Sequence, residues 1–278
     1  MELIYIIFLF IIIFIILKII INKCYFMMDF FNISYNNSKI ITNDKKYFEK
    51  MYQSKKINEL VNNNMLKNPI KRKNKILFIT YDNRYQLKYV SIHNDNLNKY
   101  VKKYNYEYIF YKTCNKNVYW CKIYFVLDVL KTNNYDYVVW LDSDTIIKKF
   151  DIDFGDILNM FSSDIFVGSD NNSTYNLINS GVFAIKNSII GLNFLNDCIN
   201  NINSDCMNFD GTLKGKWAAS CYEQGVMNIL IIDKYFNNTT ILTNSIIFNY
   251  NVCSNDVFIM HLYASSSNNR INCFNSKK

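Results

Sequence analysis

Tyr137-Val-Val-Trp-Leu-Asp-Ser-Asp-Thr-Ile-Ile147 is an apolar run that leads directly into two carboxylates, Asp142 and Asp144. An apolar run of this length that is rich in Val and Trp is typical of a buried β-strand, and the change to polar residues marks its carboxyl end. In an open α/β sheet, ligands bind at that end. Side chains alternate along an extended backbone, so Asp142 and Asp144 would point to the same side and could bind one hard divalent cation.

Strands and helices alternate on the N-terminal side of this run. Residues 75–81 and 106–111 are apolar segments that predict two further strands. The residues between the strands show helical spacing, with Leu97, Tyr100, Val101 and Tyr104 in one helix and Trp120, Ile123, Tyr124, Leu127 and Leu130 in the next. Asn105 follows the first helix where a left-handed cap would lie. This succession predicts an α/β fold with a largely parallel, doubly wound sheet of the Rossmann-like kind.

The pattern continues beyond Asp144 without a second domain or a repeat. Residues 165–168 and 182–185 predict strands, residues 188–200 a helix, and residues 223–232 an apolar helix. A last apolar segment, residues 257–260, runs into His261, one of only two histidines. Residues 75–278 are therefore predicted to form one domain.

The N-terminus predicts a membrane anchor. Residues 3–21 are apolar except for Lys18, and a membrane span needs about 20 such residues. We therefore expect residues 1–22 to form a single-pass transmembrane helix that contacts membrane lipid. A cleaved signal peptide is the alternative, but its apolar region would be shorter and no small-residue cleavage site follows. Lys18 and Lys23 on the C-terminal flank favour a cytosolic location for the rest of the chain.

Residues 23–74 predict a basic stem with some helix around residues 45–66. Ten Lys or Arg and three acids lie between Asp44 and Lys75, so this segment carries about seven of the formal net charge of +8. The remainder is nearly neutral, whereas a nucleic-acid-binding protein would carry its positive charge on a folded face. The sequence therefore predicts no nucleic-acid partner. The stem is either solvated or lies along anionic lipid, which would require a cytosolic face.

The eight cysteines do not predict a metal site. They form no CxxC pair and no Cys/His cluster with zinc spacing. Cys24 adjoins the predicted span, which leaves seven cysteines in the remaining chain, an odd number that cannot all pair. The cysteines alone do not decide the compartment.

Each candidate site residue also has an ordinary interpretation. Two acids separated by one residue recur at Asp151 and Asp153, so such a pair arises easily as turn or helix-cap acids; only the first pair follows a predicted buried strand. A lone His261 is more often a hydrogen-bonded surface residue. Lys122 is expected to point away from the apolar stripe of its helix and into solvent.

The remaining candidates have similar alternatives. Glu223 and Gln224 are common residues at a helix N-terminus, where the macrodipole favours acids. Asn179, Ser180 and Gly181 before a strand are typical of a turn. Taken singly, none of these residues predicts chemistry.

The order and spacing of these pieces resemble a family. The matching motifs are Trp120-x-Lys122, Trp140-Leu-Asp-Ser-Asp144, Leu177-Ile-Asn-Ser-Gly-Val-Phe-Ala-Ile-Lys-Asn-Ser188, Glu223-Gln224 and His261. They resemble the galactosyl- and mannosyltransferases of the fungal α-galactosyltransferase and mannan-polymerase type, which include plant xyloglucan xylosyltransferases. The resemblance spans roughly residues 75–261. It implies a single GT-A nucleotide-sugar transferase domain behind an N-terminal membrane anchor.

The resemblance also implies a role for each matching residue. Asp142, Asp144 and His261 would bind Mn²⁺, or Mg²⁺, against the diphosphate of a UDP- or GDP-sugar. Lys122 would counter phosphate charge. The other implied donor contacts are Ser143, Asn179, Ser180 and Gly181, with Gly181 allowing close backbone approach. Residues 80–84, after the first predicted strand, suggest where a base would bind, with Thr80 and Tyr81 as the candidate contacts. Glu223 and Gln224 would face the sugar opposite the leaving group and stabilise an oxocarbenium-like transition state.

The implied reaction moves a hexose or pentose to a glycan or glycoprotein acceptor and retains the α configuration. We expect front-face displacement, in which the acceptor hydroxyl attacks from the side that the nucleotide leaves; a covalent intermediate on Glu223 is the alternative. The family resemblance implies the lumenal side of the Golgi or endoplasmic reticulum, whereas the flanking charge favours the cytosolic side. Donor, acceptor and linkage cannot be read from the sequence.

Two departures from the family pattern concern charged residues. Family members continue past the histidine with Gly and Cys and often a basic residue, whereas here Leu262-Tyr-Ala-Ser-Ser-Ser-Asn-Asn-Arg270 follows. Arg270 is the one candidate for the basic contact. The family tends to have two acids before the glutamine, and this chain has Tyr222-Glu223, so one carboxylate carries over.

Three other functions remain as alternatives. A haloacid-dehalogenase-like phosphohydrolase also has an Asp-x-Asp pair after a strand, but here Ile146 occupies the last position of that motif. A membrane-anchored glycan-binding or scaffold protein on a degenerate transferase fold would have no catalysis. Glycogenin-like transferases are nearer relatives, and the pairing of Trp120-x-Lys122 with Asp-Ser-Asp favours the first family over them.

Overall fold

The computed structural model describes residues 73–170, 178–214, 217–242 and 251–276. All of them belong to the second of two compact units, Leu66–Lys278. The predicted anchor, residues 1–22, and nearly all of the predicted stem, including its helix at 45–66, lie outside the described residues. Within the part of the chain that is described, no helix is both long and apolar enough to cross a membrane.

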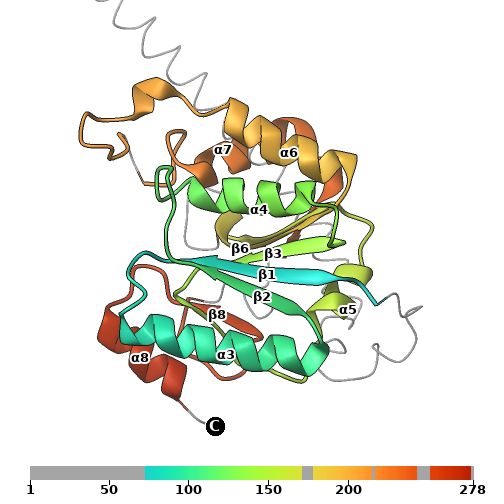
Figure 1. Cartoon of the computed structure of the whole chain (residues 1–278), viewed down its shortest axis with the longest axis vertical. Helices are drawn as coiled ribbons and strands as arrows, with labels where there is room; N and C mark the ends of the chain where they lie inside the picture. Colours follow the sequence, from blue (N-terminus) through green and yellow to red (C-terminus); the bar gives the residue numbers. More distant parts are fainter. Residues whose placement is uncertain (1–72, 171–177, 215–216, 243–250, 277–278) are drawn as a thin grey trace, which may run out of the picture. The chain divides into compact units, whose positions relative to one another are not determined.

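A six-stranded sheet in the order β2-β1-β3-β6-β5-β7 forms the centre of the domain (Figure 1). Its strands are β1 (Ile76–Tyr81), β2 (Glu107–Tyr111), β3 (Tyr137–Leu141), β5 (Ile165–Ser169), β6 (Ile178–Lys186) and β7 (Thr239–Leu242). The residues of β3 and β5 are buried throughout, as expected for strands covered on both faces. The predicted strands near 75–81, 106–111 and 137–141 are confirmed.

The prediction of a largely parallel sheet holds for every strand of this sheet except β6. β1 pairs in parallel with β2 and β3, and β5 pairs in parallel with β7, whereas β6 is antiparallel to both β3 and β5. β5 ends at Ser169 and β6 begins at Ile178, which leaves fewer than the dozen or more residues that a parallel crossover needs. The sheet is therefore mixed, within the predicted α/β class.

A separate pair of short strands lies on one side of the sheet. β4 (Thr145–Ile147) pairs antiparallel with β8 (Ile259–His261), and Thr145 is opposite His261. Each strand has three residues, too few for a periodic signal, so neither was predicted as a strand with these bounds. The pairing places His261 beside the segment that carries Asp142 and Asp144.

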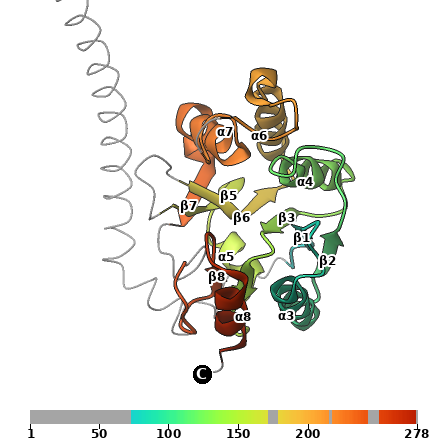
Figure 2. The ribbon, with the colours of Figure 1, turned by 90° about the vertical axis from the view of Figure 1, so that its left-hand side faces the viewer.

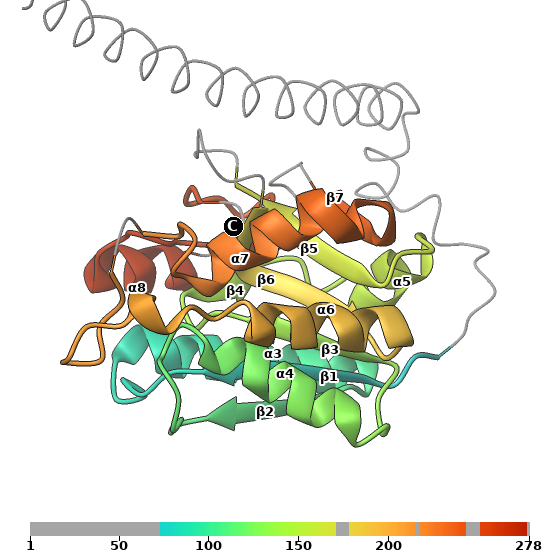
Figure 3. The same ribbon diagram turned by 90° about the horizontal axis from the view of Figure 1, so that it is seen from above.

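Helices cover both faces of the sheet. α4 (Cys121–Lys131), α6 (Ile189–Asn200) and α7 (Glu223–Leu230) form one layer, as Figures 1 and 3 show. On the opposite side, α3 (Lys88–Tyr104) packs against α8 (Ser267–Asn275), as Figure 2 shows. The remaining helical segments are α5 (Phe154–Asn159), two 3₁₀ turns at Ser204–Cys206 and Phe236–Asn238, and a π-helical turn at Ile231–Tyr235.

Helix α3 ends with the predicted left-handed cap. Asn105 has φ 57° and ψ 43°, and its backbone N–H donates to the carbonyl of Val101. Asn tolerates this conformation better than most residues, whereas a β-branched side chain does not.

We expect Asn105→Val to lower the free energy of unfolding by about 1–2 kcal/mol because of this strain, and Asn105→Gly to leave it within about 1 kcal/mol of the parent. Urea unfolding of the three proteins measures both effects. Equal stability of the Val and Gly variants would contradict the assigned cap.

Three disulfides join cysteines of the described residues: Cys114–Cys121, Cys206–Cys221 and Cys253–Cys273. Cys198 on α6 is a buried free thiol, and burial raises its pKa. The odd number of cysteines after Cys24 is thus accounted for by one unpaired residue.

Candidate active site

Asp142, Asp144 and His261 converge at the carboxyl end of β3. The backbone N–H of Asp142 donates to the carbonyl of Gly181 at 2.8 Å, and the N–H of Leu262 donates to the carbonyl of Asp144 at 3.0 Å. His261 Nε2 lies 3.0 Å from Asp144 Oδ1 and 3.9 Å from Asp142 Oδ2. One ligand atom from each of the three residues lies within 4.8 Å of the others. His261 is 2% exposed, so the interpretation of it as a surface residue is wrong.

Gly181 makes room for this histidine. A Cβ atom added to Gly181 would lie 2.0 Å from Cε1 of His261, a separation that side chains do not adopt. The resemblance implied that Gly181 allows backbone to approach the donor; in the structure its missing side chain allows the His261 ring to approach the backbone instead, and Gly181 does not line the pocket described below.

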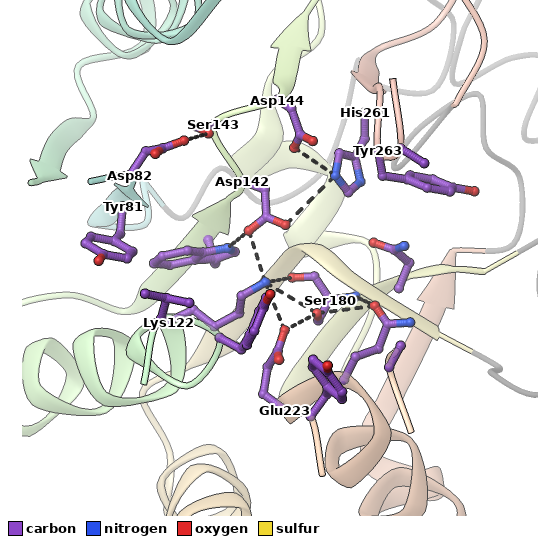
Figure 4. A pocket seen from close by; sticks show the side chains of 18 of the residues that line it. Tyr81, Asp82, Lys122, Asp142, Ser143, Asp144, Ser180, Glu223, His261 and Tyr263 are labelled. Atoms are coloured by element: carbon purple, nitrogen blue, oxygen red, sulfur yellow. Dashed lines mark hydrogen bonds and ion pairs between the residues drawn. The ribbon is translucent and has the colours of Figure 1, made fainter. Parts of the chain in front are cut away.

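The three side chains could offer a Mn²⁺ or Mg²⁺ ion one carboxylate oxygen each from Asp142 and Asp144 and one ring nitrogen from His261. Asp142 Oδ1 accepts from Trp140 Nε1 at 2.7 Å and Lys122 Nζ at 3.0 Å, and Asp144 Oδ2 accepts from Arg270 Nη2 at 2.7 Å. The other oxygen of each carboxylate faces His261, as Figure 4 shows. Neighbours that hold the non-ligating oxygens orient a metal site. Two carboxylates with one imidazole suit Mn²⁺ better than Mg²⁺.

Burial and charge act in opposite directions on Asp144. Burial alone raises the pKa of this carboxyl, but the adjacent His261 and Arg270 outweigh it and hold the pKa well below its usual range. Asp144 is therefore ionised at neutral pH, as a metal ligand must be. Arg270 comes from α8, and the Cys253–Cys273 disulfide ties the same helix to the segment before β8.

Lys122 lies in the middle of the site, between Asp142 and Glu223 (Figure 4). Its Nζ is 3.0 Å from Asp142 Oδ1 and 3.2 Å from Glu223 Oε1. The residue is 7% exposed, so the expectation of a solvent-facing lysine is wrong. Burial lowers the pKa of Lys122, but the two carboxylates outweigh it and raise the pKa above its ordinary value.

Glu223 and Gln224 open α7 beneath β6, and both are buried. Ser180 connects to each of them: its Oγ donates to Glu223 Oε1 at 2.9 Å, and its N–H donates to Gln224 Oε1 at 3.0 Å. Asn179 Oδ1 accepts from the N–H of Gly181 at 2.9 Å. The predicted turn at these positions is the first part of β6, which brings Asn179 and Ser180 to the pocket wall.

The end of β1 forms the opposite wall. Tyr81 lines the pocket as expected. Thr80 was also expected there, but it is fully buried, and its Oγ1 lies 3.0 Å from His93 Nε2. Ser143 Oγ donates to Asp82 Oδ2 at 2.5 Å. Arg84 also holds Asp82, at 3.0 Å. Burial raises the pKa of Asp82, but the hydrogen bonds from Arg84 and Ser143 outweigh it and lower the pKa.

These walls enclose a pocket of about 690 Å³. The pocket lining also includes residues that the sequence did not identify as site residues: Val118, Tyr119, Trp217, Tyr222 and Tyr263. Asp82 and Arg84 also line the pocket, and they belong to residues 80–84 after the first strand, which suggested where a base would bind. The aromatic residues have no local signal, because distant loops bring them together.

The second acidic pair has a structural role. Asp153 caps α5, accepting from the N–H of Gly155 at 2.9 Å, and also accepts from the hydroxyl of Tyr106 at 2.5 Å. Neither Asp151 nor Asp153 lines the pocket. Of the two Asp-x-Asp pairs, only the one that follows a buried strand, Asp142 and Asp144, lines the pocket.

The mixed, Rossmann-like α/β sheet is consistent with a nucleotide-sugar transferase domain. Residues 71–269 match the nucleotide-diphospho-sugar transferase family, and the chain belongs to that family. It is thus a glycosyltransferase by family, and the match favours a transferase over a phosphohydrolase.

Solved structures agree in fold. The structure of a glycosyltransferase involved in the glycosylation of the major capsid of PBCV-1 superposes with a TM-score of 0.56 and 11% identity, covering 72% of this chain and 98% of that one. The glycosyltransferase GlyE of Streptococcus pneumoniae TIGR4 gives a TM-score of 0.45 and 13% identity, covering 73% of this chain and 61% of that one; this lower score adds nothing to the fold assignment. No curated protein sequence shows a significant match.

Proposed function

We propose that this chain is a metal-dependent, retaining glycosyltransferase that moves a hexose or pentose from a UDP- or GDP-sugar to a glycan or glycoprotein acceptor. The fungal galactosyl-, mannosyl- and xylosyltransferase type resembled by its motifs is the proposed subfamily. The observation that carries the proposal is the convergence of Asp142, Asp144 and His261 on one face of the pocket that Glu223 also lines.

The charged side chains of the pocket suit the binding of a nucleoside diphosphate. In this proposal the diphosphate lies beside Asp142, Asp144 and His261, which would hold a Mn²⁺ or Mg²⁺ ion. That ion would supply positive charge to neutralise the leaving group. Lys122 and Arg270 add positive charge next to the two aspartates. The nucleoside extends toward Tyr81 and the Ser143–Asp82 pair at the end of β1.

The sugar then lies between the diphosphate and Glu223. The acceptor hydroxyl attacks the anomeric carbon from the leaving-group side, the bond from carbon to phosphate oxygen breaks, and the hydroxyl proton passes to a phosphate oxygen. Glu223 faces the opposite side of the sugar, where its negative charge stabilises the oxocarbenium-like transition state. Glu223 Oε1 already accepts from Ser180 and contacts Lys122, which supports an electrostatic role over a covalent glycosyl intermediate.

Membrane anchoring through residues 1–22 is part of the proposal. For the side of the membrane, the family resemblance implies the lumen of the endoplasmic reticulum or Golgi, and the flanking lysines favour the cytosol. Disulfides persist in oxidising compartments, and the three disulfides among the described residues support the lumenal side.

The test is donor hydrolysis by the full-length chain with a panel of UDP- and GDP-sugars. We expect release of a nucleoside diphosphate from at least one donor with Mn²⁺, and loss of this release with EDTA. Asp142→Ala with Asp144→Ala should abolish it, because two of the three proposed ligands are removed. The matched control is Asp151→Ala, an exposed acid outside the pocket, which should retain full activity.

Three outcomes would contradict the proposal. Hydrolysis of a phosphoester with release of phosphate would favour a phosphohydrolase. Glycan binding without any turnover, undiminished in the double aspartate variant, would favour a scaffold protein. Equal release of the nucleoside diphosphate with and without the metal would show that the reaction does not depend on the metal.

A further inference from the structure

Two disulfide-closed segments meet at one side of the pocket. The Cys114–Cys121 segment contributes Val118 and Tyr119 to the lining, and the Cys206–Cys221 segment, described at 206–214 and 217–221, contributes Trp217 and Ala218. Asn117 Nδ2 donates to the carbonyl of Gly211 at 2.9 Å and links the segments. A disulfide therefore closes each segment, and this hydrogen bond links the two segments although they are distant in sequence.

Three aromatic rings contact one another where these segments meet. The ring centroid of Trp217 lies 5.1 Å from that of Tyr119 and 5.1 Å from that of Tyr222, and the two tyrosines are 5.0 Å apart. Such separations are those of favourable aromatic pairs. Tyr222 is 8% exposed, whereas Trp217 is 66% exposed. The tyrosines thus support an indole that remains open to solvent.

The chemistry of this aromatic cluster differs from that of the rest of the pocket. The cluster contains no lysine, arginine or histidine side chain, so it does not suit a phosphate. Aromatic side chains that line a pocket are typical of ligand-binding sites, and Trp217 presents most of its surface to solvent. A pyranose ring has an apolar face of C–H groups with hydroxyls at its rim, which matches an open indole face.

The position of the cluster suits the acceptor. Tyr222 immediately precedes Glu223, and the three aromatic residues line the same pocket as Glu223. Tyr222 therefore connects the cluster to the carboxylate that is proposed to face the transferred sugar. The open face of Trp217 is accessible from solvent, as needed for a large acceptor that binds after the donor fills the interior.

We propose that Trp217, supported by Tyr119 and Tyr222, binds a sugar ring of the acceptor. The inference rests on the proposed transferase function and deepens it: the acceptor is a glycan that already carries at least one pyranose, and not an unmodified protein side chain.

The test compares Trp217→Ala with Phe209→Ala in the full-length chain. Phe209 is a matched control, because it is an exposed aromatic residue of the same disulfide-closed segment and does not line the pocket. Two reactions are measured with the best donor: hydrolysis, in which water is the acceptor, and transfer to p-nitrophenyl pyranosides or to serine- and threonine-containing peptides. Binding of the pyranosides is measured separately by saturation-transfer NMR, which needs no turnover.

We expect Trp217→Ala to raise the KM for the best pyranoside at least tenfold and to weaken its NMR signal, and to lower donor hydrolysis by less than it lowers transfer. Trp217→Phe should restore part of the affinity, and Phe209→Ala should change nothing. The inference would be overturned by an unchanged pyranoside KM, by an equal loss of donor hydrolysis, or by transfer to peptides in preference to every pyranoside.

The two proposals fail in different ways. A parent chain that binds pyranosides through Trp217 but hydrolyses no donor would contradict the transferase and keep the sugar site. If the chain hydrolyses donors, and Trp217→Ala binds pyranosides as well as the parent, the transferase proposal stands and the sugar-binding role of Trp217 is contradicted.

Discussion

Gly181→Ala is expected to lower metal-dependent donor turnover about 100-fold, although the substitution adds a single methyl group. The new Cβ would lie 2.0 Å from Cε1, 2.5 Å from Nδ1 and 2.8 Å from Nε2 of His261. His261 is 2% exposed, and its backbone is fixed by the pairing of β8 with β4, so the ring has to rotate away from Asp144. Changes around metal ligands typically cost about 10–100-fold in affinity or activity. Mn²⁺ affinity by titration calorimetry and donor hydrolysis measure the effect.

A double variant separates this mechanism from general damage to β6. If alanine at position 181 acts by displacing His261, then His261→Ala should cause a similar loss, and the combination should be hardly worse than either change alone. Residues that act through the same contact are not additive. Losses that multiply in the double variant would contradict the proposed role of Gly181. So would full Mn²⁺ affinity in the single Gly181→Ala variant.

The sequence predicted those parts of the site that depend on local patterns. An apolar run before Asp142 and Asp144 identified β3 and its carboxyl end, and a left-handed residue was correctly placed at Asn105. Ser188 was predicted at the start of a helix, and it caps α6 by accepting from the N–H of Gly191. In each case, the residues that form the local sequence pattern are the same residues that form the strand, the cap or the helix start.

Local patterns failed where an element is buried on more than one side. Lys122 was placed in solvent because the apolar stripe of its helix points elsewhere. However, α4 packs against the sheet and also against α6, and most of its residues are buried, from Cys121 to Leu130. A single apolar stripe describes a helix with one covered face. Lys122 is buried because its charge is compensated by carboxylates from β3 and α7, which no local window contains.

Long-range pairing explains the other differences. His261 is brought to Asp144 by β4 and β8, which are three residues each, and Arg270 is brought there by α8. The helix α8 had a usable signal, since Ser266 caps it by accepting from the N–H of Asn269, but its sequence lacks an apolar period. The family resemblance had paired His261 with the aspartates; periodicity alone had not.

Lys122→Met is expected to lower the free energy of unfolding by about 3 kcal/mol, because removing one partner of a buried ion pair leaves a charge uncompensated. The side chain of Lys122 is 9% exposed and that of Glu223 is 7% exposed, so water cannot replace the lost contact. Urea unfolding of the metal-free chain measures the change. The matched control is Lys99→Met, at an exposed position within α3, where Lys and Met have similar helix propensities and the change should stay within about 0.5 kcal/mol.

The partner of Lys122 provides the decisive comparison. Glu223→Gln removes the negative charge and keeps an oxygen that can accept from Ser180, which donates to Glu223 at 2.9 Å in the parent. Combining Glu223→Gln with Lys122→Met should therefore restore at least about 1 kcal/mol relative to the sum of the two single changes, a coupling typical of residues in one charged network. Strict additivity would mean that Lys122 stabilises the chain through Asp142 alone. In that case the buried lysine would not connect the metal ligands to the carboxylate proposed to face the transferred sugar.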